Sequence, residues 1–209
     1  MLYEKAVQPP TLALLKKLTK LEILKSFALG GGTNIALRLG HRLSIDLDFF
    51  TSESFDKVQL LHVISKQFPS AELLFEQNQT MLFIIDDVRV DFVQYPFPWL
   101  LPFEHIGEVR LISLKDIIPM KLQAVSNRFA KKDFWDIVFL LKAYPLKEMI
   151  LIFKEKFPNI DPGYIIHSLT NFEEAENQLN PDVLTDISWQ EVKNILSAAV
   201  KGFLNYNLR

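Results

Sequence analysis

The stretch Phe27-Ala-Leu-Gly-Gly-Gly-Thr-Asn-Ile-Ala-Leu-Arg-Leu-Gly40 decides the fold. Its short apolar run leads into three glycines, and an apolar-periodic segment then extends from Thr33 to Leu39. Glycine favours tight turns and helix ends, and threonine often caps the first turn of a helix. The stretch therefore predicts a strand, a glycine turn and a helix that Thr33 caps and Gly40 ends. A dinucleotide-binding turn is not expected, because the G-x-G-x-x-G pattern is absent.

Paired acids follow this turn, in Ser44-Ile-Asp46-Leu-Asp48, after thirteen residues that separate Gly32 from Asp46. Residues 43–50 alternate as a strand does, so the two carboxylates are predicted to project from one face. The apolar residues of this strand are predicted to face the core: Ile45, Leu47 and Phe49. Carboxylates this close repel each other unless a cation lies between them, and Mg²⁺ is the usual partner of oxygen ligands. Taken alone, the pair is better explained as two solvated acids on an edge strand.

A third acid lies in Arg89-Val-Asp91-Phe-Val93, another alternating stretch, which we expect to form a neighbouring strand with Asp91 on its polar side. Three carboxylates can hold two Mg²⁺ ions about 3.5–4 Å apart for in-line phosphoryl displacement. The glycine turn adds backbone N–H groups at the positive end of a helix, a site suited to a triphosphate. Together these motifs predict metal-dependent phosphoryl transfer.

The remaining pattern predicts an α/β (α+β) fold with a mixed sheet, followed by an all-helical C-terminal domain. Helices are expected at 11–25 and 54–68, and residues 71–95 contain three short strand-like pieces with turns near Asn78 and Asp86-Asp87. From Ser113 the periodicity is helical, at 114–129, 132–144, 146–157, 162–178 with a break, and 188–206. Three prolines within residues 95–102 separate the halves. We place a catalytic core at 1–110 and a helical domain at 111–209.

Composition narrows the classes of protein. The chain has 209 residues, 49% of them hydrophobic, and no cysteine, which excludes disulfides and thiolate metal sites. No apolar run is long enough to span a membrane and no signal peptide is apparent, so we expect a cytoplasmic protein without membrane contact. Residues 110–147 carry eight basic and three acidic side chains, a net charge of +5, whereas the whole chain is at -2. A segment of that charge is compatible with phosphate or RNA contact.

The helical half contains a second polar cluster around Lys121, Arg128 and Lys132-Asp133-Phe-Trp-Asp136. Lys121 and Arg128 share one helical stripe and could face the same anion. For Asp136 we expect a helix-surface acid that pairs with Lys132, four residues earlier. Pro119 predicts that the helix either begins there or is kinked.

These motifs occur in an order that resembles a known superfamily and one family within it. Gly31-Gly32, Asp46-x-Asp48 and Asp91 resemble the signature of polymerase β-like nucleotidyltransferases, with Thr33 where many members have serine. Over residues 25–143, the chain is similar to the AbiEii/AbiGii-type nucleotidyltransferase toxins, which have a matching lysine and Lys-Asp pair. The resemblance implies metal binding by Asp46, Asp48 and Asp91, and active-site roles for Lys121 and Asp133. It further implies a set of nucleotide- or phosphate-binding residues: Gly31, Gly32, Thr33, Arg42, Ser44 and Arg128.

The function implied by this resemblance is transfer of a nucleoside monophosphate from an NTP to an acceptor hydroxyl, with Mg²⁺ or alternatively Mn²⁺. It also implies the toxin of a toxin–antitoxin or phage abortive-infection pair, with tRNA as acceptor and a cognate antitoxin as partner. In the transfer, Lys121 would neutralise charge on the phosphoryl group, and Asp133 would either orient Lys121 or assist the acceptor. The alternatives are nucleotidylation of a small molecule or a protein, and a non-catalytic nucleotide-binding module. Two further interpretations stay open for four aromatic residues, as a stacking surface for a base or as core: Tyr95, Phe97, Trp99 and Phe103.

Overall fold

The computed structural model describes residues 1–207, and the chain divides into two compact units. The first unit is Met1–Ser113, and the second begins at Leu114. The first contains a sheet with helices, and the named elements of the second are all helices. The expected α/β class, with a mixed sheet followed by a helical half, is confirmed.

The first unit is built on one sheet in the strand order β3-β4-β5-β2-β1-β7-β6. Strands β2 and β5 are parallel, as are β1 and β7, and the other neighbours are antiparallel. The sheet is therefore mixed, and β5 is the neighbour of β2 that the alternation around Asp91 predicted. The strand bounds are β1 Ala28–Leu29, β2 Leu47–Thr51, β3 Glu72–Gln77, β4 Thr80–Ile85, β5 Val88–Gln94, β6 Glu104–Ile106 and β7 Val109–Leu111.

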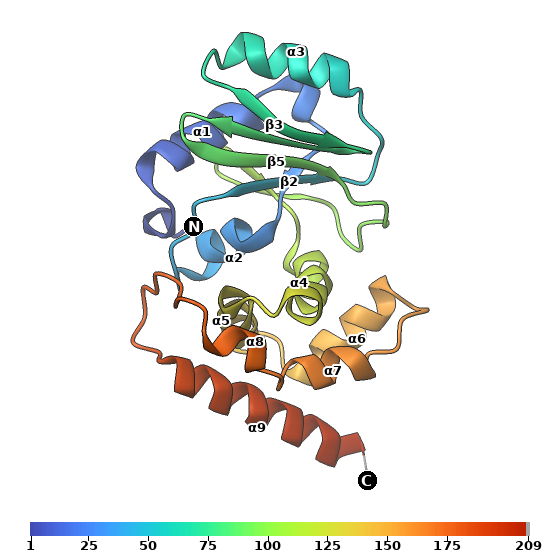
Figure 1. Ribbon diagram of the computed structural model, residues 1–209. Coiled ribbons are helices and arrows are strands. Elements are labelled where there is room, and N and C mark those ends of the chain that lie inside the picture. The colour runs from blue at the N-terminus through green and yellow to red at the C-terminus, as the bar shows by residue number, and fades with distance from the viewer. Residues whose placement is uncertain (208–209) are drawn as a thin grey trace. The chain divides into compact units, whose positions relative to one another are not determined.

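One face of this sheet is buried under helices α1 (Pro9–Thr19) and α3 (Lys57–Gln67), whose leucines and isoleucine join the sheet's apolar side chains in one core. Helix α2 (Gly31–Leu39) lies on the other side of the sheet from α3 (Figure 1). Short 3-10 turns, Glu4–Ala6 and Glu22–Leu24, flank α1. Because side chains alternate along β2 and β5, apolar residues on one side hold the sheet to its core while polar residues face α2.

Five details of the first unit differ from the prediction. Helix α1 ends at Thr19 rather than near residue 25, and β2 begins at Leu47, so the preceding residues lie outside the β2–β5 ladder. Ile45 is consequently 59% exposed, and the expectation that it faces the core is wrong. Thr33 does not cap α2, because Gly30 occupies that position. Strands β6 and β7 were not predicted, since three residues are too few to show an alternating pattern.

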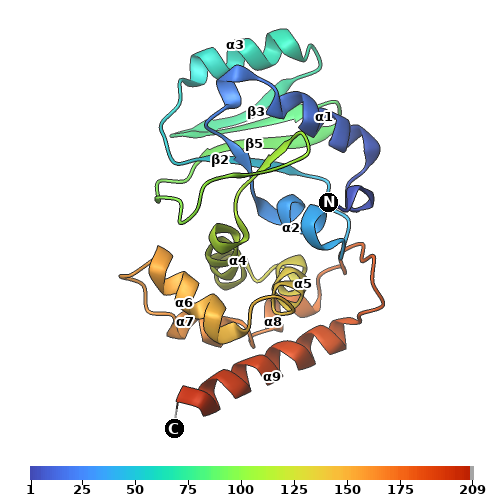
Figure 2. The same ribbon diagram turned by 180° about the vertical axis from the view of Figure 1, so that it is seen from behind.

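The second unit contains six helices in its described part: α4 Leu114–Arg128, α5 Lys131–Leu140, α6 Leu146–Lys156, α7 Gly163–Ser168, α8 Glu173–Glu176 and α9 Trp189–Asn207 (Figure 2). Each predicted helix is present, and the predicted break separates α7 from α8. Trp135 of α5 stacks on Trp189 of α9 with ring centroids 5.3 Å apart, which joins the last helix to the helical core.

Helix α4 passes through Pro119, five residues after its first residue. The alternative that the helix begins at the proline is therefore wrong. Because proline has no backbone N–H, the carbonyl of Lys115 lacks its usual helical donor.

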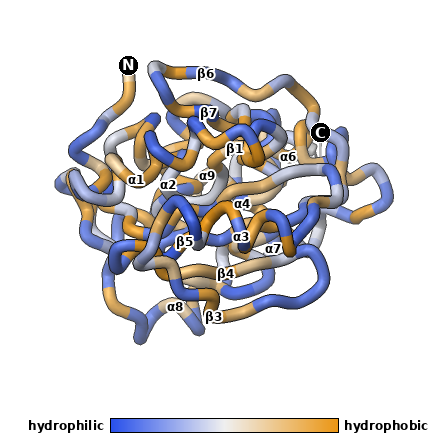
Figure 3. The backbone as a smooth tube through the Cα atoms, turned by 90° about the horizontal axis from the view of Figure 1, so that it is seen from above, coloured by the Kyte–Doolittle hydropathy of each residue, from blue (hydrophilic) through white to orange (hydrophobic). Residues whose placement is uncertain are grey.

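No helix within the described residues combines the length and apolar character needed to cross a membrane. Hydrophobic and hydrophilic stretches alternate along the chain instead (Figure 3).

Candidate active site

The glycine turn is closed against the acidic strand. The backbone N–H of Gly30 donates to the Asp48 carbonyl at 2.8 Å, and α2 begins at the next residue. Gly31 has a φ of +60°, and a Cβ on it would lie 2.0 Å from an Asp48 carboxylate oxygen. Only glycine combines that backbone angle with so close an approach. The turn therefore brings the Asp48 carboxylate directly against the N-terminus of α2.

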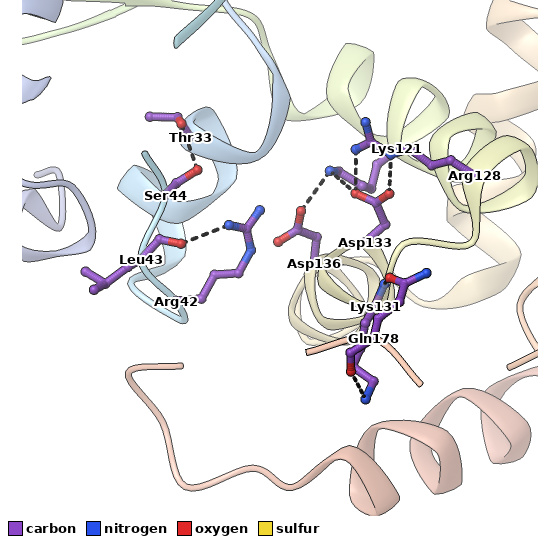
Figure 4. Close-up of polar contacts among 10 residues, drawn as sticks. All are labelled: Thr33, Arg42, Leu43, Ser44, Lys121, Arg128, Lys131, Asp133, Asp136 and Gln178. Atoms are coloured by element: carbon purple, nitrogen blue, oxygen red, sulfur yellow. Dashed lines mark hydrogen bonds and ion pairs between the residues drawn. The ribbon is translucent and has the colours of Figure 1, made fainter. Parts of the chain in front are cut away.

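Polar side chains surround the next residue of the turn. A Cβ on Gly32 would lie 2.2 Å from an Arg42 guanidinium nitrogen, and the buried Arg42 also donates to the Leu43 carbonyl at 2.9 Å. The hydroxyl oxygens of Thr33 and Ser44 are 2.8 Å apart and share a hydrogen bond (Figure 4). The phosphate-binding residues expected in this unit are thus gathered at one helix N-terminus, where orphan N–H groups and the helix dipole favour an anion.

Thr33 has a further contact that the sequence did not predict. Its hydroxyl donates to the carbonyl of Asp46, and this hydrogen bond connects α2 to the segment before β2. This segment is also fixed by a bridge between Ser44 and Val7, whose strand-like pairing includes a 2.9 Å bond from the Ser44 N–H to the Ala6 carbonyl. Asp46 lies outside the β2 ladder, and its segment is held by the Thr33 hydroxyl and by the Ser44–Val7 bridge.

Two of the three expected acids are direct neighbours in the sheet. The parallel register of β2 and β5 sets Leu47 opposite Val90 and Asp48 opposite Asp91. Leu47 and Val90 are fully buried in the core, so the two aspartates point to the opposite face. Asp46 lies one residue before β2, and the register continued backwards would set it beside Arg89. All three acids are therefore on or next to the central strand pair.

Arg89 is hydrogen-bonded to Asp91, the third of the expected acids. Its Nε and Nη2 donate to the two carboxylate oxygens of Asp91 at 3.1 and 2.9 Å. The hydrogen bond with Asp91 raises the pKa of Arg89 above its ordinary value, against a smaller opposing effect of burial. The negative charges of Asp46 and Asp48 act in the same direction as Asp91. No role was predicted for Arg89, although its place two residues before Asp91 on one strand face was the available signal.

These donors suit a hard divalent cation, since they are carboxylate oxygens on adjoining strands. Within residues 1–207, no group of three or more acidic, histidine or cysteine side chains is already arranged to hold a metal ion. The donor chemistry and the Asp48–Asp91 register fit such an ion, with Arg89 occupying the Asp91 oxygens.

Asn34 is a second residue that the sequence analysis missed. It is fully buried, and its side-chain N–H groups donate to the Leu29 carbonyl at 2.8 Å and the Ile112 carbonyl at 2.9 Å. Its carbonyl oxygen accepts from Arg38 at 2.8 Å. Asn34 therefore fixes α2 to β1 and to the segment after β7, and so positions the glycine turn. An asparagine inside a short helix is the only sequence signal for it.

The second unit contains its own ion-pair cluster. The Lys121 side chain is only 4% exposed, and its Nζ lies 2.9 Å from Asp133 and 2.7 Å from Asp136 (Figure 4). Arg128 donates to both oxygens of Asp133, at 2.7 and 2.9 Å. Lys121 and Arg128 thus face one anion, as their helical stripe predicted, and the anion is the Asp133 carboxylate. Burial tends to raise the pKa of Asp133, but Lys121 and Arg128 outweigh it and hold that pKa below its ordinary value.

Asp136 is fully buried, and its partner is Lys121. The expectation of a helix-surface acid paired with Lys132 is therefore wrong. Helix spacing offers Asp136 only partners on α5 itself, whereas Lys121 lies on α4, and it is the burial of this side of α5 that brings the two together.

The aromatic residues after β5 stack on one another. The rings of Tyr95 and Trp99 are stacked at 5.6 Å, and Trp99 contacts Phe103 edge-on at 5.4 Å. Phe50 of β2 meets Tyr95 edge-on at 6.2 Å, and a Cβ on Gly30 would lie 2.6 Å from the Phe50 ring. The aromatic cluster therefore packs against the glycine turn through Phe50.

Comparisons with known proteins find nucleotidyltransferases. The model of the family described as "Nucleotidyl transferase AbiEii toxin, Type IV TA system" matches residues 13–95, which include the glycine turn and all three acids. An uncharacterized protein of Aquifex aeolicus (strain VF5), aq_aa25, is 34% identical over 196 residues, which cover 91% of this chain and 94% of that protein.

Two solved structures share the fold. JHP933 from Helicobacter pylori matches with a TM-score of 0.57 at 19% identity, over 96% of this chain and 92% of that one. MenT4, a nucleotidyltransferase toxin from Mycobacterium tuberculosis H37Rv, matches with a TM-score of 0.56 at 15% identity, over 90% and 83% of the two chains. Residues 13–95 of the chain, with the glycine turn and the three acids, therefore match the AbiEii nucleotidyltransferase toxin family.

Proposed function

We propose that this nucleotidyltransferase moves a nucleoside monophosphate from an NTP to an acceptor hydroxyl, with pyrophosphate as leaving group. One observation carries the proposal: Asp48 lies in register with Asp91 and against Gly31 at the start of α2. Acids for a metal and amides for a phosphate are thus adjacent. In-line displacement at a phosphorus atom requires both.

In this proposal Asp46, Asp48 and Asp91 hold Mg²⁺, or alternatively Mn²⁺. The bound metal would offset the negative charge that develops on the phosphoryl oxygens. The chain's own contribution is positioning. The α2 N-terminus, Arg42 and Ser44 bind the triphosphate, and Thr33 holds the Asp46 segment in place through its hydrogen bond.

The resemblance implies that Lys121 neutralises charge on the transferring phosphoryl group, but its ammonium is buried between Asp133 and Asp136, so we assign it to holding these two carboxylates in place. The ion pair of Lys121 with Asp133 supports an orienting role for Asp133, which was one of the two roles considered from the sequence. Arg128 donates to the same carboxylate, and because its side chain is 54% exposed we also assign it to phosphate contact.

For the acceptor we favour the tRNA 3′ end, and for the biological setting a toxin with a cognate antitoxin. The toxin family supports the setting. The +5 segment supports RNA contact only in part, because Lys121 and Lys131 are buried and Arg110 donates to the Phe27 and Leu24 carbonyls. The lysines of this segment that remain exposed for phosphate contact are Lys115, Lys132, Lys142 and Lys147.

The test is an incubation of the protein with each of the four α-labelled NTPs, Mg²⁺ and total tRNA, with and without excess chelator. We expect label on tRNA with one or two of the NTPs, and none with chelator. Label on the protein itself or on an added aminoglycoside, with tRNA unlabelled, would favour the alternative acceptors. No label in any fraction would contradict the proposal.

A further inference from the structure

The Arg89–Asp91 contact is a bidentate ion pair within one strand. Both residues lie on the polar face of β5, two positions apart, so their side chains are neighbours without any turn between them. Both oxygens of Asp91 accept from the guanidinium. Asp91 is mostly buried, with 15% of its side chain exposed, whereas Arg89 is 51% exposed. The arginine therefore covers the acid from the solvent side.

Arg89 also lies within the field of the other two acids. Asp48 is the register partner of Asp91, and the ladder continued by one residue sets Asp46 beside Arg89. Three carboxylates on or next to two neighbouring strands repel one another in the absence of a cation. Arg89 is the cation that the strand itself supplies, and both acids contribute to its electrostatic environment.

A divalent metal and a guanidinium need the same Asp91 oxygens. Metal ligation uses the oxygen lone pairs that the two N–H donors occupy, and the two cations repel each other at that distance. Because Arg89 is half exposed, its side chain has room to move away without disturbing the core.

We propose that Arg89 is a built-in counter-cation of the acid cluster, which holds Asp91 before the metal binds and is displaced when the metal enters. This inference rests on the proposed function, because it takes the three acids as the metal site. An orienting arginine, which would hold Asp91 for the metal, predicts the opposite effect of its removal.

The test measures Mn²⁺ affinity directly, by electron paramagnetic resonance of the free ion during titration of the full-length protein, with no turnover involved. Arg89→Gln should bind Mn²⁺ about three- to tenfold more tightly than wild type, the range expected for loss of one partly exposed charge-assisted pair. Arg89→Lys keeps the positive charge but loses the two-pronged hydrogen bonding of the guanidinium. Its Mn²⁺ affinity should therefore lie between those of Arg89→Gln and wild type. The control is Lys20→Gln, which removes one positive charge from the exposed Lys20–Glu108 pair of the same unit and should bind as wild type does.

A second readout uses stability. In chelator, Arg89→Gln should unfold at a lower temperature than wild type, and saturating Mn²⁺ should raise its melting temperature by more than it raises that of wild type. Equal or weaker Mn²⁺ binding by Arg89→Gln would overturn the counter-cation role, and so would equal tightening in Lys20→Gln. Asp48→Asn separates the two proposals: if wild type binds Mn²⁺ and Asp48→Asn does not, the metal site stands whatever Arg89→Gln does. If wild type binds no Mn²⁺, both fail.

Discussion

Asp48 and Asp91 are register partners on the parallel strands β2 and β5, and the Asp48 carboxylate lies against Gly31, the first residue of α2. The pairing explains why acids 43 positions apart in sequence belong to one site. The contact with Gly31 explains why the turn must be glycine. Several expectations for variants follow from these two contacts and from the ion pairs of the helical unit.

Replacing Gly31 with alanine should disrupt the acid site. The new methyl group would meet the Asp48 carboxylate, and the φ of +60° would be strained as well. Gly107→Ala is a matched control, because Gly107 has a φ of +61° and nothing within 4 Å of a Cβ. We expect both variants to lose about 1–2 kcal/mol of stability from backbone strain. Only Gly31→Ala should lose transfer activity, by about 100-fold or more, a value typical of misplaced catalytic groups.

Equal loss of activity in the two glycine variants would show that strain alone is responsible. The contact between Gly31 and Asp48 would then have no special role in catalysis.

The Thr33 hydroxyl should matter for activity more than for folding. Thr33→Val removes the donor to the Asp46 carbonyl, whereas Thr33→Ser keeps it. We expect Thr33→Val to lower kcat/KM by about tenfold, the effect of a lost hydrogen bond worth about 1.4 kcal/mol in the transition state. Thr33→Ser should stay within about twofold of wild type. Similar kinetics for the two variants would contradict the positioning role of the hydroxyl.

Lys121 should be important for stability as well as for activity. Its removal leaves the buried Asp133 and Asp136 without the ammonium group that they share. Lys121→Met should therefore cost about 3–5 kcal/mol in free energy of unfolding, as when one partner of a buried ion pair is removed. Lys132, which is exposed and directly precedes Asp133, is the control. Lys132→Met should change the free energy of unfolding by about 0.5 kcal/mol or less. Urea unfolding of both variants decides the point, and equal stability would contradict the assignment.

Stability should fall at low pH in a way that depends on Asp133. The pKa of Asp133 is lower in the folded protein than its ordinary value, so the unfolded chain binds a proton at a higher pH than the folded one. The contribution is complete above the unfolded pKa of about 4 and is lost as the pH falls through the lower, folded pKa. Urea midpoints measured from pH 6 to pH 3 should decline more steeply for wild type than for Asp133→Asn. Parallel curves would exclude Asp133 as a source of this dependence.

The sequence was sufficient to predict the helices and strands that have a clear hydrophobic period or are bounded by glycine or turn residues. Gly40 ends α2, the turns at Asn78 and Asp86-Asp87 separate β3, β4 and β5, and every long helix of the second unit follows its apolar periodicity. The three-residue strands β6 and β7 were not predictable, because they are too short for alternation to be recognised.

Side-chain partners were less predictable than elements. Asp136 has Lys132 four residues away in sequence, yet it pairs with Lys121 from another helix, and only the packing of α4 on α5 reveals this. Ile45 follows the alternation of β2 but lies before its first paired residue, so it is exposed. Arg89 was visible in the alternating stretch around Asp91, but its hydrogen bonds to Asp91 required coordinates.

The most direct test of the central claim is the transfer assay with Asp48→Asn, a substitution that keeps the shape of the side chain and removes its charge. The account predicts that the folded variant binds Mn²⁺ at least tenfold more weakly and transfers label from NTP to tRNA at least about 100-fold more slowly than wild type. Near-wild-type unfolding would show that the fold is intact. Full transfer activity in a folded Asp48→Asn protein would contradict the assignment of Asp48 to a metal-dependent nucleotidyltransferase site.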